Sequence, residues 1–115
     1  MSIPVFVFGS NLAGRHGKGA AKFAKDYRGA IYGQGIGRQG NSYAIPTKND
    51  MLKTLPLEDI YVYVRDFIDY AHRHQNLTFE VTKIGCGLAG YREHQMSALF
   101  RDAPSNCILP PGWRS

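Results

Sequence analysis

The chain has 115 residues, a length that predicts one domain (1–115) and is small for an enzyme with an added specificity module. Hydrophobic residues make up 43% of the sequence and charged residues 20%, a balance that is typical of globular proteins and excludes an intrinsically disordered chain. The net charge of +5 favours anionic partners, but the cations are scattered and form no basic tail.

The two cysteines, Cys86 and Cys107, lack the spacing of a metal site, so we expect reduced thiols and no bound metal. No signal peptide is recognisable, and no apolar run is long enough to cross a bilayer. We therefore expect a cytoplasmic protein with no membrane partner and no cofactor.

A glycine-rich loop between a strand and a helix stands near the start of the chain. Residues 3–8 include four consecutive apolar residues, which is typical of a strand covered on both faces. The loop GSNLAGRHGKG follows at residues 9–19, and residues 18–27 have the composition of a helix. Because glycine amides and a helix start can together form a concavity for phosphate, this stretch predicts an anion-binding loop.

The next segment carries weaker signals. Residues 30–32 predict a short strand, and the glycine-rich residues 33–41 predict a flexible, exposed loop. Residues 42–45 predict a strand that stops at Pro46 and leaves Lys48 just beyond its end.

The second half of the chain contains the longest predicted helix. Pro56 begins it, and apolar residues recur at spacings of three and four as far as about residue 72. A strand is then predicted at residues 79–84, a helix at 92–101 and a last strand at 106–109. Alternating strands and helices predict an α/β fold, specifically a three-layer α/β/α sandwich with a mixed central sheet.

Ligands in open α/β sheets collect at the carboxyl ends of the strands. Three segments are expected there, namely residues 9–19, residues 45–48 and the second glycine-rich loop IGCGLAGY at residues 84–91. Two glycine-rich loops at strand ends can hold a diphosphate from both sides.

Three motifs in this order resemble the macro-domain family. They are NLAGRHGKGAA at residues 11–21, IPTK at residues 45–48 and IGCGLAGY at residues 84–91. The resemblance extends from about residue 5 to about residue 100. It is greatest to the branch that removes ADP-ribose from proteins or DNA, which includes terminal ADP-ribose glycohydrolases and the antitoxins of DNA-ADP-ribosylating toxins.

The resemblance implies roles for individual residues. Asn11 would hydrogen-bond the distal ribose, and residues 17–19 and 85–90 would enclose the diphosphate. Lys48 would be the functional lysine, since an amine with a lowered pKa can attack the anomeric carbon to give a Schiff base. The catalytic candidate is therefore Lys48, and the ligand-binding candidates are Gly9, Ser10, Asn11, Gly17, Gly19, Thr47, Gly85, Cys86, Gly87, Leu88, Ala89, Gly90 and Tyr91.

The sequence also departs from the family pattern. Ala89 stands where the glycohydrolases have an acidic residue and other macro domains an aromatic one, a role for which Tyr91 is the nearest candidate. No residue matches the acidic residue that contacts adenine in macro domains. The ligand is therefore left open between ADP-ribose and a related diphosphate or cyclic nucleotide.

Each candidate residue also has a purely structural interpretation. Asn11 can cap its own loop, and Lys48 can be a solvated cation on an exposed turn. Cys86 can be a small buried apolar residue. His16 can contact a phosphate or lie on the surface.

Three functions follow from these patterns. The first is a module that binds an ADP-ribose-like nucleotide, and the second is a hydrolase that releases ADP-ribose from a modified macromolecule with Lys48 as nucleophile. The third is a nucleic-acid binder that uses the basic surface, although the sequence has no alternation of aromatic and basic residues for stacking bases. The oligomeric state is left open.

Overall fold

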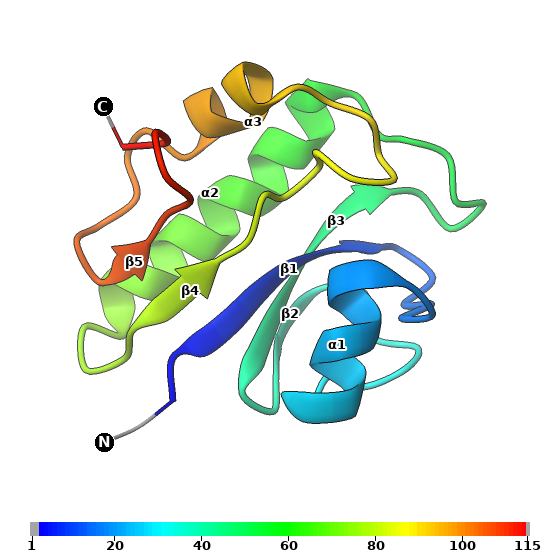
Figure 1. Cartoon of the computed structure of the whole chain (residues 1–115), viewed down its shortest axis with the longest axis horizontal. Helices are drawn as coiled ribbons and strands as arrows, with labels where there is room; N and C mark the ends of the chain where they lie inside the picture. The colour runs from blue at the N-terminus through cyan, green and yellow to red at the C-terminus, as the bar shows by residue number, and fades with distance from the viewer. Residues whose placement is uncertain (1–2, 115) are drawn as a thin grey trace.

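The structure is a computed structural model that describes residues 3–114. The chain forms an α/β fold with one five-stranded mixed sheet and three helices (Figure 1). The elements are β1 (Val5–Asn11), α1 (Gly19–Tyr27), β2 (Gly37–Gln39), β3 (Ser42–Lys48), α2 (Leu57–Arg73), β4 (Phe79–Val81), α3 (Glu93–Leu99) and β5 (Cys107–Ile108). None of the helices in this part of the chain has both the length and the apolar character needed to cross a membrane.

The order of strands across the sheet is β2-β3-β1-β4-β5. The central strand β1 is parallel to β3 and β4, β5 is parallel to β4, and β2 is antiparallel to β3 at one edge. The carboxyl ends of β1, β3 and β4 therefore meet at one end of the sheet, where open α/β sheets bind their ligands.

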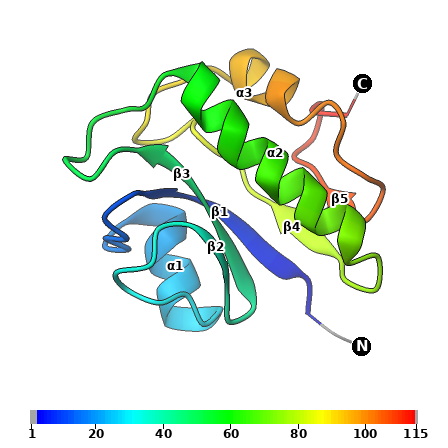
Figure 2. The same ribbon diagram turned by 180° about the vertical axis from the view of Figure 1, so that it is seen from behind.

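Side chains of β1 alternate between the two faces of the sheet. Phe6 and Phe8 belong to a small apolar cluster with Ala21 and Ala24 of α1. Small residues on α1 let the helix approach the strands closely. Figures 1 and 2 show α1 against one face of the sheet and α2 with α3 on the other side.

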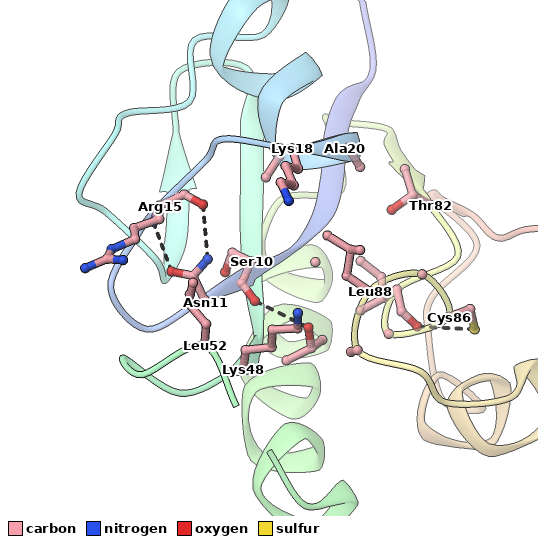
Figure 3. Close-up of a pocket in the computed structure, with 18 of the residues that line it drawn as sticks. Ser10, Asn11, Arg15, Lys18, Ala20, Lys48, Leu52, Thr82, Cys86 and Leu88 are labelled. Carbon is pink, nitrogen blue, oxygen red and sulfur yellow. Dashed lines mark hydrogen bonds between the residues drawn. The ribbon is translucent and has the colours of Figure 1, made fainter. Parts of the chain in front are cut away.

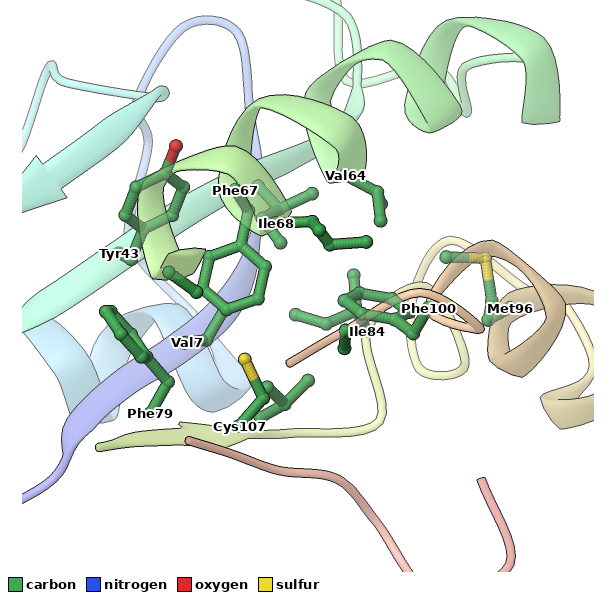
Figure 4. Packing of buried hydrophobic residues seen from close by; sticks show 14 of the residues in the cluster. Val7, Tyr43, Val64, Phe67, Ile68, Phe79, Ile84, Met96, Phe100 and Cys107 are labelled. Atoms are coloured by element: carbon green, nitrogen blue, oxygen red, sulfur yellow. The ribbon is translucent and has the colours of Figure 1, made fainter. Parts of the chain in front are cut away.

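The larger core lies between the sheet and α2 (Figure 4). Its centre is Phe67, whose ring centroid lies 5.1 Å from that of Tyr43, 5.4 Å from that of Phe79 and 6.4 Å from that of Phe100. The apolar spacing that predicted the long helix is confirmed, because its buried residues are Ile60, Val64, Phe67, Ile68 and Ala71.

The segment between α1 and β3 differs from the prediction. Residues 30–32 form no strand, and residues 33–41 are not a flexible, exposed loop, because Gly37–Gln39 forms β2 and Gly35 is buried. The order comes from the buried Gln39 side chain, which donates to the Gln34 carbonyl at 3.0 Å and accepts the Ile31 N–H at 2.8 Å. The hydrogen bonds of Gln39 thus order a segment that has few apolar residues to pack.

Several element ends also differ from the prediction. Strand β3 continues through Pro46 to Lys48, because β2 pairs with β3 only as far as Ala44 and leaves that side of the strand free for a proline. Helix α2 begins after Pro56, which is its N-cap, and ends at Arg73. Elements β4, α3 and β5 are shorter than predicted.

Candidate functional site

The loops that follow β1, β3 and β4 enclose a cavity of about 810 Å³ (Figure 3). This volume lies within the range of about 300–1,000 Å³ that is usual for small-molecule sites. The lining includes Lys48 and all predicted ligand-binding residues except Gly90 and Tyr91. Those in the lining are Gly9, Ser10, Asn11, Gly17, Gly19, Thr47, Gly85, Cys86, Gly87, Leu88 and Ala89. Their ligand contacts stay predictions.

Tyr91 lies outside the lining and braces two loops. Its hydroxyl group donates a hydrogen bond of 2.5 Å to the backbone oxygen of Leu55. The phenol therefore joins the loop after β4 to the chain just before α2.

An irregularity in the strand pairing brings Asn11 and Lys48 together. Ser10 pairs with Pro46, but the next residue, Asn11, pairs with Lys48, so Thr47 is the extra residue of a β-bulge. Bulges redirect side chains and recur at strand ends near functional sites. The two residues that the sequence marks for ligand and catalytic roles are thus neighbours across two strands.

The Asn11 side chain holds the first glycine-rich loop in shape. Its Oδ1 accepts the Arg15 N–H at 2.9 Å, and its Nδ2 donates to the Arg15 carbonyl at 3.1 Å (Figure 3). The capping interpretation of Asn11 is therefore correct. A primary amide has two N–H groups and two lone pairs, so one of each is left for a ligand.

The first turn of α1 presents unpaired amides to the cavity. Lys18 is the N-cap and makes no side-chain capping bond. Among the hydrogen bonds of the described residues, none is donated by the backbone N–H of Gly19, Ala20 or Ala21, and all three residues line the cavity. A helix start with free N–H groups attracts anions.

The second glycine-rich loop offers a similar set of donors. In the part of the chain that the structure describes, the amides of Gly87, Leu88 and Ala89 donate no hydrogen bond. Gly85 begins the loop at a φ of +79°, and a Cβ there would overlap the Met96 side chain. Consecutive free amides in a turn form a concavity for an anion. Two such concavities therefore line one cavity.

The charged side chains that line the cavity are all positive. The charged residues of the lining are Arg15, Lys18, Lys48 and Lys83, with no aspartate or glutamate from residues 3–114. Lys83 pairs with Glu93 outside the lining at 3.3 Å. In Figure 3 the Lys18 ammonium group points toward Ser10 and Leu88, whereas the Arg15 guanidinium group points away from them.

The Cys86 thiol lines the cavity but is not an activated nucleophile. Burial raises its pKa, and the negative charge of Glu93 raises it further. The thiol therefore stays protonated near neutral pH, whereas cysteine nucleophiles react as thiolates.

His16 is neither exposed nor part of the cavity lining, so both of its predicted alternatives are wrong. The side chain is fully buried, and its ring lies edge-on to Phe8 with 5.3 Å between centroids. Its Nε2 lies 2.9 Å from the Gln34 carbonyl oxygen, which requires a proton on that nitrogen. His16 thus ties the first glycine-rich loop to the segment before β2.

The lining also contains residues that the sequence did not mark. Arg15 and Lys18 lie within the first glycine-rich loop, so their positive charge was a usable signal. Tyr32 and Leu52 come from segments with no motif, and only the folded chain brings them to the cavity. The remaining unmarked lining residues are Ala20, Ala21, Thr82, Lys83 and Ile84.

The described residues contain no group of three histidine, cysteine, aspartate or glutamate side chains that is suited to a metal ion. Comparisons with protein-family models, curated proteins and solved structures gave no match for this chain.

Proposed function

We propose that the chain binds ADP-ribose or a related diphosphate nucleotide in the cavity at the ends of β1, β3 and β4. We also propose that the sheet and its helices form a three-layer α/β/α sandwich of the macro-domain type, on the basis of the three ordered motifs. One observation carries the functional proposal: the free amides of the first α1 turn and those of Gly87, Leu88 and Ala89 line the same cavity.

A diphosphate matches these donors in number and charge. Each phosphate group can accept hydrogen bonds from one set of amides, and the lysines of the lining balance the negative charge. A carboxylate in the cavity would repel such a ligand, and the lining within residues 3–114 has none. Two separate sets of donors favour a diphosphate over a single phosphate.

Asn11 is suited to the ribose next to the diphosphate. It keeps one N–H and one lone pair after its two bonds to Arg15, and a pair of neighbouring hydroxyl groups offers the complementary acceptor and donor. The bond to Arg15 also holds the amide in one orientation, which reduces the entropy lost on binding.

Calorimetric titration with ADP-ribose tests the proposal. We expect a dissociation constant in the micromolar range, about −8 kcal/mol. Lys18→Glu should weaken binding at least about tenfold, because the new carboxylate at the N-cap would occupy the free amides of α1. Arg101→Glu is the matched control, since it changes net charge equally at an exposed position outside the lining.

Two results would contradict the proposal. One is the absence of binding heat with ADP-ribose, ADP and AMP for the wild-type protein. The other is an equal loss of affinity in Lys18→Glu and Arg101→Glu, which would indicate only a general effect of net charge.

Hydrolysis of an ADP-ribosyl bond is the second candidate function. Lys48 lines the cavity beside Asn11, and it forms no ion pair with any residue between 3 and 114. An amine at this place can reach the anomeric carbon of a ribose held by Asn11.

Lys48→Arg separates the two functions, because arginine keeps the positive charge but is not a nucleophile near neutral pH. With ADP-ribosylated DNA and protein as substrates, the hydrolase proposal expects release by the wild type and none by Lys48→Arg. Both proteins should bind ADP-ribose with similar affinity. No release by the wild type would remove the enzyme and leave a binding module.

A further inference from the structure

A second groove lies between α2 and the start of β3. Its volume is about 530 Å³, and its lining consists of Tyr43, Asp66, Asp69, Tyr70, His72 and Arg73. None of these residues lines the cavity of the proposed function, which includes Lys48 at the other end of β3. The volume lies within the range of about 300–1,000 Å³ that is usual for small-molecule sites, so the groove is large enough for a ligand of its own.

The Tyr43 hydroxyl group has no partner in the part of the chain that the structure describes. The residue is only 6% exposed, because its ring packs against those of Phe67 and Tyr70 with centroid separations of 5.1 and 5.2 Å. The Tyr70 hydroxyl group accepts a bond from Arg38 Nη1 at 3.0 Å, whereas that of Tyr43 forms none. Figure 4 shows the Tyr43 hydroxyl group pointing away from the other labelled side chains of the core. Because buried tyrosines usually have a partner for this group, that of Tyr43 is available to a ligand in the groove.

Two carboxylates without an ion pair stand on the helix side of the groove. Asp66 and Asp69 are three residues apart on α2, a spacing that puts both side chains on one face of the helix. Neither forms an ion pair with any residue between 3 and 114. Arg73 follows Asp69 by one turn, but its Nε donates to the Asp69 backbone carbonyl at 3.2 Å and not to the carboxylate. The groove thus has two carboxylates against one guanidinium group, whereas the charged side chains of the cavity are all positive.

The Tyr43 hydroxyl group lies within the electrostatic reach of these charges. Burial, and next the negative charge of Asp66, raise the pKa of Tyr43 to about 12, whereas the positive charge of Arg73 lowers it. The phenol therefore keeps its proton near neutral pH. The groove offers a cation two carboxylates on α2 and a neutral hydroxyl oxygen on β3.

We propose that this groove binds a primary ammonium group on a short aliphatic chain. An ammonium group has three N–H donors, which match in number the carboxylates of Asp66 and Asp69 and the hydroxyl oxygen of Tyr43. Hydrogen bonds to an ionised partner are about twice as strong as those between neutral groups. The half-buried Tyr70 ring, stacked on His74 with 3.9 Å between centroids, gives the aliphatic chain an apolar surface beside these acceptors.

A free amine and a lysine side chain in a peptide share this chemistry, so the experiment uses a probe for each. Butylamine represents the free amine, and Nα-acetyl-lysine N-methylamide represents the peptide. Butyltrimethylammonium is the matched control ligand, because it keeps the charge and the chain but has no N–H group. Titrations are followed by proton–nitrogen correlation NMR spectra, which report on the backbone amides of Tyr43 and of residues 66–73.

We expect butylamine to bind with a dissociation constant of about 1 mM, which is within reach of a ligand with so few atoms. The amide shifts should be confined to Tyr43 and residues 66–73. Butyltrimethylammonium should bind at least about fivefold more weakly, because it cannot donate to the carboxylates. Tighter binding of the lysine derivative than of butylamine would assign the groove to a peptide, and weaker binding would assign it to a free amine.

Three variants test the residues of the groove. Asp66→Asn and Asp69→Asn should each weaken butylamine by about five- to tenfold, since each removes one charged acceptor. Tyr43→Phe should weaken it by about threefold or more, yet leave the melting temperature unchanged, because the hydroxyl group has no bond within the described chain to lose. Asp59→Asn is the matched control, since it makes the same change at an exposed position of α2 outside the lining and should leave the affinity unchanged.

Four outcomes would overturn the inference. They are the absence of shifts in the groove with both amines, equal binding of butylamine and butyltrimethylammonium, unchanged affinity in Tyr43→Phe, and an effect of Asp59→Asn as large as that of Asp66→Asn and Asp69→Asn. Melting curves show that the variants fold. None of these outcomes bears on ADP-ribose binding, because the groove and the cavity share no lining residue.

Discussion

Asn11 spans the first glycine-rich loop with two hydrogen bonds to the backbone of Arg15, and it pairs with Lys48 in the sheet. From the sequence, loop capping and ligand binding were alternative roles for this residue. In the folded chain the capping role leaves half of the amide's hydrogen-bonding capacity unused. A side chain that is fixed by its own loop is also well suited to orient a ligand.

At the same scale, the buried Cys107 thiol makes the free energy of unfolding fall as the pH rises above about 9. Burial raises the pKa of its thiol from 9.0 to about 11. A raised pKa means that the folded state retains a proton that the unfolded state loses, so the stabilisation is complete below pH 9 and disappears as pH rises toward 11.

We therefore expect the wild type to lose about 2 kcal/mol more than Cys107→Ala in free energy of unfolding between about pH 8 and about pH 10.5. Urea unfolding at the two pH values measures the difference. The buried Tyr43, with a pKa of about 12, acts in the same direction in both proteins and so cancels in the comparison. An equal pH dependence in the two proteins would contradict the assignment to Cys107.

Among the elements, the segment between α1 and β3 braces the first glycine-rich loop. Its backbone N–H at Gly33 donates to the Gly14 carbonyl at 2.8 Å, and its Gly35 carbonyl accepts the Ser10 hydroxyl at 2.5 Å. The His16 ring adds a hydrogen bond of 2.9 Å to the Gln34 carbonyl. The shape of the predicted phosphate loop therefore depends on contacts with a segment that also contributes Tyr32 to the cavity lining.

Gly35→Ala tests this bracing. A Cβ at this position would overlap the backbone oxygen of Asn11, which cannot move without disturbing the loop. We expect a loss of about 2 kcal/mol or more in free energy of unfolding, measured by urea denaturation.

Gly87→Ala is the control, because its Cβ would meet no atom within 4 Å and its backbone has no positive φ. Its stability should stay within about 0.5 kcal/mol of the wild type. Equal destabilisation by the two substitutions would exclude a specific role for the Gly35 approach.

For the whole molecule, the cavity joins parts that are far apart in the sequence. The loop after β1 and the loop after β4 lie more than 60 residues apart but meet because β1 and β4 are adjacent parallel strands. A ligand that contacts both loops would stabilise the folded chain as a unit.

At an ADP-ribose concentration of about 100 times the dissociation constant, we expect the free energy of unfolding to rise by about 2.7 kcal/mol. For a chain of this size the melting temperature should then rise by about 10 °C, which scanning calorimetry measures. Hydrogen exchange should slow in both glycine-rich loops. Protection confined to one loop would indicate that the ligand does not bridge them.

The sequence by itself predicted the parts of the fold that local patterns encode. The apolar spacing of α2 and the strand–loop–helix order around β1 and α1 are confirmed. Periodicity and composition specify such elements because their signal lies within a short stretch of consecutive residues. The same patterns marked most of the residues that line the cavity, since glycine-rich turns and strand ends are visible without a structure.

Only the tertiary structure decided how these parts meet. The burial of His16 and Gln39, the pairing of Asn11 with Lys48 and the position of Leu52 in the cavity depend on contacts between distant segments. The physical reason is that strand register and buried polar bonds depend on the free energy of packing distant segments together. A local stretch of sequence does not determine that free energy.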